Sequence, residues 1–218
     1  MIKPYYETEL GKLYHGDCLE ILPELEQVSL CLTDPPYGIG WDKRPTWGTS
    51  NKGKVTEYGK QIWDSSPISK EQIETIYKKS NNQIIFGANH FVEILKNSSC
   101  WIVWDKDNTG NFADCELAYT SFATAVRKFK WRWNGMLKEA PETRYHPTQK
   151  PVGLFMQILE KYSERHHTIL DPFLGSGTTA IACERLNRRW IGIEKELKYV
   201  EIAAKRIESE ASQLKLFR

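Results

Sequence analysis

The C-terminal third of the chain contains the pattern that most restricts the possible folds. A short apolar strand is predicted at 168–170, followed by a turn with Gly175 and Gly177 and an apolar helix at 178–186. A second strand is predicted at 190–193 and is followed directly by Glu194. A strand, a helix and a strand at this spacing indicate two parallel strands joined by a crossover helix. Such a unit predicts an α/β fold, with a mostly parallel sheet and helices on both faces.

The rest of the chain continues this alternation of strands and helices. An unbroken apolar run at 28–33 ends at Asp34, as expected of a buried strand that leads into a loop. Residues 116–122 and 125–133 alternate in polarity and predict an antiparallel pair. No repeat or linker interrupts the 218 residues, so one domain is expected. Further strands are predicted at 11–17, 83–86 and 99–104, and further helices near 19–25, at 70–80, from Lys150-Pro151 onward and at 195–209.

Composition limits the class of protein more than it identifies one. No stretch approaches the roughly 20 apolar residues that a membrane span needs, so no membrane partner is expected. The five cysteines form no CxxC pair, and the histidines lack metal-ligand spacing. We therefore expect free thiols in a reducing cytoplasm and no bound metal. The net charge of +2 neither requires nor excludes nucleic acid.

The glycine-containing turn predicts a nucleoside site. Glycines at 175 and 177 allow the backbone to approach a ligand closely and to present it to the N-terminus of the next helix. Glu194 is placed to bind a ribose. A phosphate loop would have lysine after Gly177, where this chain has Thr178, and the third glycine of a dinucleotide site is replaced by Ala180. A nucleoside without a pyrophosphate therefore fits better than ATP or NAD.

A second loop, Asp34-Pro35-Pro36-Tyr37, follows the apolar strand at 28–33. Two prolines make this loop stiff and remove two backbone donors, so it presents carbonyl acceptors. Asp34 adds a carboxylate acceptor and Tyr37 a flat aromatic face. Rigid acceptors beside an aromatic ring are suited to holding a planar amino group while a base stacks.

Together these motifs resemble those of the amino-methyltransferases of DNA. Asp34-Pro35-Pro36-Tyr37 precedes Phe173-Leu-Gly175-Ser-Gly177, and this order is similar to that of the circularly permuted β group. The segment from His146 to Val152 resembles the stretch before the cofactor strand of that family, and Gly16-Asp17 resembles its adenine-binding element. The resemblance runs from about residue 11 to 207. It implies the Rossmann-like fold of S-adenosylmethionine-dependent methyltransferases.

The resemblance also implies how the cofactor S-adenosylmethionine is bound. Glu194 would hold the ribose hydroxyls, and Asp17, with Cys18 beside it, would bind the adenine. Lys150 and Pro151 would close over the cofactor. The methionine part would lie among the residues of the glycine turn, namely Asp171, Phe173, Gly175, Ser176, Gly177 and Thr178.

For the reaction, the resemblance implies direct methyl transfer to an exocyclic amino group. Asp34 and the carbonyl of Pro35 would accept the two amino hydrogens, Pro36 would stiffen the loop, and Tyr37 would stack on a base flipped out of double-stranded DNA. No cysteine nucleophile is needed for this chemistry. Asp rather than Ser at the head of the tetrapeptide favours N6 of adenine over N4 of cytosine.

Two polar segments are candidates for DNA contacts. Residues 105–145 lie where the family has its target-recognition region, and 38–69 form a long polar stretch that we expect to be a mobile loop. The short recognition region leaves open a short target, relaxed specificity or a homodimer. The candidate DNA-binding residues are Lys43 and Arg44 in the loop, and Arg127, Lys128, Lys130, Arg132 and Trp133 in the recognition region.

Three other functions are compatible with parts of this pattern. An N4-cytosine DNA methyltransferase would share the fold and both loops. An RNA or protein-amide methyltransferase would use the same acceptor geometry. A catalytically silent DNA-binding subunit would not need both loops to be intact. Site-specific methylation of DNA in a bacterial or phage restriction–modification system is the function that the motifs favour.

Overall fold

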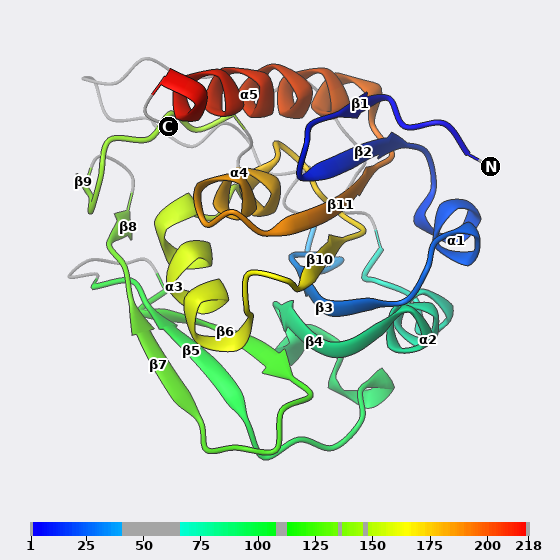
Figure 1. The fold of residues 1–218 in the computed structure, drawn as a ribbon. Helices are drawn as coiled ribbons and strands as arrows, with labels where there is room; N and C mark the ends of the chain where they lie inside the picture. The colour runs from blue at the N-terminus through cyan, green and yellow to red at the C-terminus, as the bar shows by residue number, and fades with distance from the viewer. Residues whose placement is uncertain (1, 41–65, 108–112, 135–136, 146–147, 217–218) are drawn as a thin grey trace.

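The computed structural model describes residues 2–40, 66–107, 113–134, 137–145 and 148–216. Within them, one sheet has the strand order β1-β2-β11-β10-β3-β4-β6-β5-β7 (Figure 1). Five neighbouring strands at its centre, from β2 to β4, are all parallel. The strands of the sheet are β1 (Tyr6–Glu7), β2 (Gly11–His15), β3 (Val28–Thr33), β4 (Ser80–Phe86), β5 (Trp101–Asp105), β6 (Cys115–Thr120), β7 (Arg127–Lys130), β10 (Thr168–Asp171) and β11 (Arg189–Glu194).

Helices cover both faces of this sheet, as the sequence predicts (Figure 1). Side chains along β3 alternate between the faces: Leu30 and Leu32 belong to one buried cluster and Cys31 to the other. The first cluster packs against α3 (Val152–Tyr162), α4 (Thr178–Arg185) and α5 (Leu197–Leu216). The second packs against α1 (Cys18–Ile21), the 3-10 turn η1 (Leu22–Glu24) and α2 (Lys70–Lys79). The sheet is therefore buried on both sides, which explains the unbroken apolar run of β3.

The predicted antiparallel pair at 116–122 and 125–133 is wrong. Both segments contain strands, but β5 lies between them: β6 pairs with β5 antiparallel, and β7 pairs with the other edge of β5 in parallel. The cause is that β6 also pairs with β4, which buries Ala118 and Tyr119 in the middle of the sheet. Two strands of the predicted recognition region, β6 and β7, thus belong to the main sheet.

Smaller differences concern the ends of elements. Pro151 precedes α3 as its N-cap, with extended backbone, instead of being the first helical residue. The helix predicted from residue 19 is short, and Pro23 falls in the 3-10 turn that follows it. Two further 3-10 turns, η3 (Ala88–His90) and η4 (Val92–Ile94), and the hairpin of β8 (Trp133–Asn134) and β9 (Leu137–Lys138) complete the described elements. No helix in the described part of the chain is long and apolar enough to span a membrane.

Candidate active site

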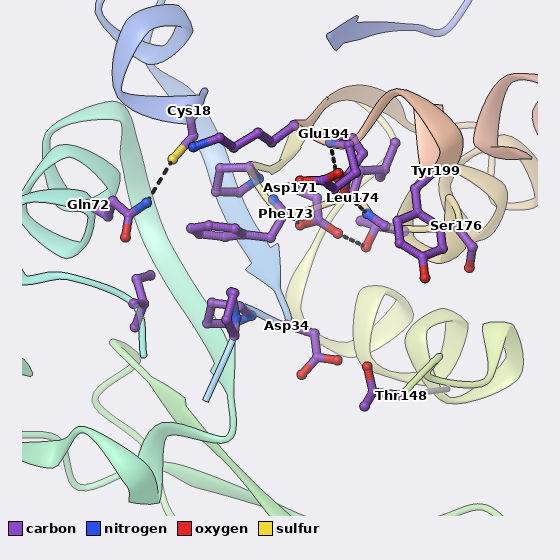
Figure 2. A pocket seen from close by; sticks show the side chains of 18 of the residues that line it. Cys18, Asp34, Gln72, Thr148, Asp171, Phe173, Leu174, Ser176, Glu194 and Tyr199 are labelled. Atoms are coloured by element: carbon purple, nitrogen blue, oxygen red, sulfur yellow. Dashed lines mark hydrogen bonds between the residues drawn. The ribbon is translucent and has the colours of Figure 1, made fainter. Parts of the chain in front are cut away.

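A cavity of about 500 Å³ lies beyond the carboxyl ends of the parallel strands. Because β10 and β3 are parallel neighbours, the loops that follow them meet at this edge of the sheet. Open parallel sheets commonly bind ligands at this edge. Figure 2 shows Cys18 and Gln72 on one side of the cavity, Ser176 and Tyr199 on another, and Asp34 near Thr148. The two loops singled out from the sequence therefore line a single cavity.

The glycine turn has the backbone conformation that its sequence indicates. Gly175 and Gly177 have φ of +54° and +93°, the left-handed region that favours glycine. Gly177 is the N-cap of α4, and a Cβ there would lie 3.3 Å from the Cβ of Ala203. At Gly175 an added Cβ would meet nothing within 4 Å. Gly177 thus allows α5 to approach, while Gly175 leaves open space in the turn.

Asp171 holds the glycine turn to the sheet. Its buried carboxylate accepts from Thr33 Oγ1 at 2.7 Å, from the Phe173 amide at 3.1 Å and from the Thr179 hydroxyl. Burial raises its pKa to about 6, although these three donors act in the opposite direction. Asp171 also lines the cavity. Its carboxylate oxygens are nevertheless engaged within the protein, which indicates a structural contribution to the predicted cofactor site.

Glu194, at the end of β11, lines the cavity beside the glycine turn. One carboxylate oxygen accepts from the Gly175 amide at 2.7 Å and the other from the Glu196 amide at 2.8 Å. Burial raises its pKa to about 7 in spite of these two hydrogen bonds. Each carboxylate oxygen can accept a second hydrogen bond. Glu194 can therefore bind a pair of vicinal hydroxyls without losing its contacts to the backbone.

Asp17 and Cys18 line the end of the cavity next to α1. Asp17 is the N-cap of α1, accepting from the Leu19 amide at 3.0 Å, and its second oxygen binds Lys195 Nζ at 3.0 Å. The Leu19 amide is the main reason that the Asp17 pKa is lowered. The Cys18 thiol accepts from Gln72 Nε2 at 3.6 Å, and burial raises its pKa to about 11. The neutral thiol form of Cys18 is therefore favoured at physiological pH.

A polar network joins the segment before α3 to the glycine turn. Glu142 accepts from Gln149 Nε2 at 2.9 Å and from the Val152 amide at 3.0 Å. Ser176 donates to Gln149 Oε1 at 3.1 Å, and Arg206 donates to the Ser176 carbonyl at 2.6 Å. The Thr178 hydroxyl donates to the carbonyl of Lys150 at 3.2 Å. These bonds keep Lys150 and Pro151 against the turn that the resemblance assigns to the cofactor.

The ammonium of Lys150 lies on the second loop. Lys150 Nζ is 2.6 Å from Asp34 Oδ2, while the Tyr37 hydroxyl donates to Asp34 Oδ1. The Lys150 side chain is 5% exposed and that of Asp34 is 19% exposed. Burial raises the pKa of Asp34, although the charge of Lys150 opposes this shift. We expected Lys150 to close over the cofactor. The structure adds a direct ion pair to the carboxylate predicted to be catalytic.

The Asp34–Tyr37 loop is supported from both sides. The Tyr37 ring stacks on His90 with centroids 5.2 Å apart. The Ile68 amide donates to the Pro36 carbonyl at 3.1 Å, and Tyr37 forms an isolated bridge with Pro67. Pro35 is buried and lines the cavity. The segment predicted as a mobile loop therefore begins and ends beside this tetrapeptide, while residues 41–65 lie outside the described part.

The direction of β7 places the predicted DNA-contact residues at opposite edges of the sheet. Because β7 runs parallel to β5, and β5 runs in the same direction as β4, Lys130 lies at the edge of the sheet that has the cavity and Arg127 at the opposite edge. Lys130 and Arg132 both pair with Asp107, and Lys128 pairs with Asp105 at 3.2 Å. Lys43 and Arg44 lie outside the described residues.

Trp133 does not fit its predicted role in binding DNA. The side chain is 6% exposed and belongs to the core cluster beneath α3. Its indole N–H donates to the Gln149 carbonyl at 3.1 Å. The prediction that Trp133 contacts DNA is therefore wrong. The alternation of aromatic and basic residues in this segment places the tryptophan in the core and the basic side chains in solvent. Trp133 supports the segment that leads to Lys150.

Sequence reasoning missed three charged residues close to these loops. Glu116 lies 3.2 Å from Lys150, Lys106 pairs with Glu116, and Arg206 holds Ser176. Glu116 and Lys106 lie within residues 105–145, which were assigned to target recognition without separate roles. Arg206 lies in a predicted amphipathic helix, where charged residues are common and give no signal of a site. A group of Glu164, His166 and His167 on an exposed turn has ligand atoms within 4.8 Å of one another, the one such group among the described residues. This group is not part of the cavity, because no histidine is found among the described residues that line it.

A parallel sheet with a glycine turn, an acid after the next strand and an acceptor loop at one edge defines the Rossmann-like fold of S-adenosylmethionine-dependent methyltransferases. Solved structures support this assignment. A complex of M1.HpyAVI with S-adenosylmethionine is 26% identical, has a TM-score of 0.58 and covers 90% of this chain and 100% of its own. The cytosine-N4-specific PvuII DNA methyltransferase shares the fold with a TM-score of 0.64 at 17% identity, covering 97% and 95%.

Sequence relatives identify the family within this fold. Residues 59–205 match the N6/N4 family of DNA methylases, so the chain belongs to that family. The type II methyltransferase M2.DpnII of Streptococcus pneumoniae is 29% identical, covering 96% of this chain and 94% of its own. M2.LlaDCHI of Lactococcus lactis subsp. cremoris is 28% identical, covering 97% and 94%. The protein is thus a DNA methyltransferase that uses S-adenosylmethionine, whose fold and cofactor the sequence predicts correctly. The glycine turn lies inside the family match, and Asp34–Tyr37 precedes it.

Proposed function

We propose that this DNA methyltransferase acts on the N6 amino group of adenine, with Asp34 as the residue that orients the amine. The observation that carries the proposal is the position of the Asp34 carboxylate. It lies on the same cavity as Glu194 and the glycine turn, in a loop held by Tyr37, Pro36 and Ile68. A cofactor seated along the glycine turn would therefore lie beside a rigid amine acceptor.

The cavity suits the cofactor. Glu194 offers acceptors for ribose hydroxyls, Asp17 offers one for an adenine amine, and the open space at Gly175 leaves room for a ligand against the backbone. Bound S-adenosylmethionine supplies an electrophilic methyl group on a sulfonium. The remaining cofactor assignments, to Cys18, Lys150, Pro151, Asp171, Phe173, Ser176, Gly177 and Thr178, stay part of this proposal.

The residues of the chain then supply position and charge. Asp34 and the Pro35 carbonyl accept the two amino hydrogens, which directs the nitrogen lone pair at the methyl group. The carboxylate also stabilises the positive charge that develops on nitrogen. Tyr37 would exchange its contact with His90 for stacking on the flipped base. Lys130 and Arg132 would contact DNA phosphates near the cavity edge.

Adenine is favoured over cytosine by Asp34 at the head of the tetrapeptide, since Ser-Pro-Pro-Tyr is more typical of cytosine enzymes. The relatives named as type II methyltransferases support a role in bacterial restriction–modification, in which the protein would act on DNA in the cytoplasm. N4-cytosine methylation is the alternative, because the fold and the amine-acceptor geometry also allow it.

The test uses purified protein, labelled S-adenosylmethionine and unmethylated double-stranded DNA, followed by digestion to nucleosides. Label in N6-methyl-2′-deoxyadenosine is expected, and label in N4-methyl-2′-deoxycytidine would replace the proposal by its alternative. Asp34→Ala should abolish transfer and leave cofactor affinity within about threefold, because Asp34 is assigned to the amine and not to the cofactor. If Asp34→Ala retains its rate, the assignment of Asp34 is wrong even where the product is N6-methyladenine.

A further inference from the structure

Four charged side chains form a row behind the Asp34 loop. They come from different elements: Asp34 follows β3, Lys150 precedes α3, Glu116 belongs to β6 and Lys106 follows β5. Lys150 Nζ lies 2.6 Å from Asp34 Oδ2 and 3.2 Å from Glu116 Oε2, and Lys106 pairs with Glu116 Oε1. The row has two acids and two bases, and Lys150 is shared between the two acids.

Asp34 is occupied on both oxygens in this arrangement. Oδ2 accepts from Lys150, and Oδ1 accepts from the Tyr37 hydroxyl. An ammonium at 2.6 Å competes with an incoming amino group for Oδ2 and draws negative charge away from it. Under the proposed function, Asp34 has to accept from the target amine at its moment of use. Lys150 therefore has to release Asp34 Oδ2 and pair with another acid, because an unpaired buried ammonium is costly.

Glu116 has the capacity to take that ammonium. Its Oε2 is buried and lies 3.2 Å from Lys150 Nζ, within ion-pair distance, but no donor among the described residues meets it with full hydrogen-bond geometry. Buried carboxylate oxygens are rarely left without a donor. Lys106 holds the other oxygen and so keeps Oε2 directed at Lys150. A small movement of the ammonium would exchange the Asp34 bond for a bond to Glu116.

We propose that Glu116 is a positioning residue that receives the Lys150 ammonium when the target amino group binds Asp34. Lys150 then acts as a movable counter-ion between two carboxylates. In the free enzyme it neutralises Asp34, and in the substrate complex it pairs with Glu116 and leaves Asp34 free to accept from the amine. This inference rests on the proposed function of Asp34.

Glu116→Gln tests the proposal because it keeps the shape and removes the charge. We expect a 10- to 100-fold lower single-turnover methyl-transfer rate, with S-adenosylmethionine affinity close to that of the parent protein. Glu116→Asp should recover part of the rate. Glu93→Gln is the matched control: it removes an exposed glutamate on η4 and should leave the rate unchanged.

A pH profile separates positioning from a merely structural role. Lys150, Glu116 and Tyr37 face Asp34, Asp171 lies close enough to interact with it, and Lys106 faces Glu116. The charge of Glu116 helps to raise the pKa of Asp34, so its removal lowers that pKa. The acid limb of the rate profile should therefore move to lower pH in Glu116→Gln.

Two results would overturn the inference: a Glu116→Gln rate within twofold of the parent, or a rate loss with an unshifted acid limb and a lower thermal midpoint. The second would make Glu116 a structural residue. An active Asp34→Ala variant would instead refute the proposed function, so the two failures are distinguishable.

Discussion

Gly87 lies directly against the ring of Tyr37. A Cβ at position 87 would come within 1.9 Å of Tyr37 Cε1, and Gly87 has φ of +65°. The chain turns from β4 into η3 at this glycine, and η3 ends at His90, which stacks on the same ring. The position of Tyr37 therefore depends on a residue fifty positions further along the sequence.

Gly87→Ala is expected to displace Tyr37 and to strain the backbone. Alanine in the left-handed region and a clash of this size together should cost about 2 kcal/mol or more of unfolding free energy. The methyl-transfer rate should fall at least tenfold. Urea denaturation and single-turnover rates measure the two effects. A Gly87→Ala/Tyr37→Ala double variant should lose less stability than the sum of the losses of the two single variants, because the smaller side chain at position 37 removes the clash. Simple additivity would show that the contact is unimportant.

Cofactor affinity should increase with pH through the titration of Glu194. Its pKa is raised to about 7 by burial, and hydroxyl donors from a ribose favour the charged form. At pH 6 the side chain is mostly protonated and has to lose its proton on binding, whereas at pH 8 it is already charged. The dissociation constant should therefore fall roughly tenfold from pH 6 to pH 8.

Calorimetry in two buffers of different ionisation enthalpy measures the proton released. Glu194→Gln should bind more weakly and lose most of this pH dependence. Asp171, with a pKa of about 6, accounts for any slope that remains near the acid end. An unchanged slope in Glu194→Gln would contradict the assignment.

Thr179→Val should destabilise the fold through Asp171. The substitution removes the hydroxyl that donates to Asp171 Oδ2 and leaves a buried carboxylate oxygen without that donor. The expected cost is about 1–3 kcal/mol, measured by urea denaturation. Thr75→Val is the control, because Thr75 makes an exposed bond to the Glu71 carbonyl and should change stability by about 0.5 kcal/mol or less. Equal effects at both positions would argue against a structural role for Asp171.

Lys130→Ala should weaken DNA binding in a salt-dependent manner. Lys130 is 60% exposed and lies at the edge of the sheet that has the cavity, so we expect it to contact a phosphate. Loss of one phosphate contact should reduce the slope of log K against log salt by about 1 and lower affinity similarly for all sequences. Filter binding at several salt concentrations measures this slope. Arg127→Ala is the matched control at the opposite end of β7. If both variants behave alike, DNA does not approach from the cavity edge.

The order of elements and both loops could be predicted from local patterns. The continuous apolar run of β3 and the glycine turn after β10 are both visible in the types of adjacent residues. The parallel register of the two strands then brings the loops together. The pairing of β6 could not be predicted in this way. Alternating polarity marks a strand but does not say which strand lies beside it, so β6 was expected next to β7.

Trp133 and Glu116 show the same limit for single side chains. Both lie in the region 105–145, which the resemblance assigned to target recognition, yet Trp133 is buried in the core and Glu116 pairs with Lys150. Whether an aromatic or an acid faces solvent or the interior depends on which elements pack over it. Glu116 and Lys150, for example, are more than thirty positions apart. Such a contact cannot be predicted from the local sequence.

The sequence by itself determined the fold class and predicted the nucleoside site and the acceptor loop, because each depends on residue types at short spacing. Only the tertiary structure decided that Lys150 is bonded to Asp34 and shared with Glu116. The physical reason is that a charge removed from water has to find its partners in space. Those partners come from the ends of β3 and β6 and from the segment before α3, which the sheet brings to one edge.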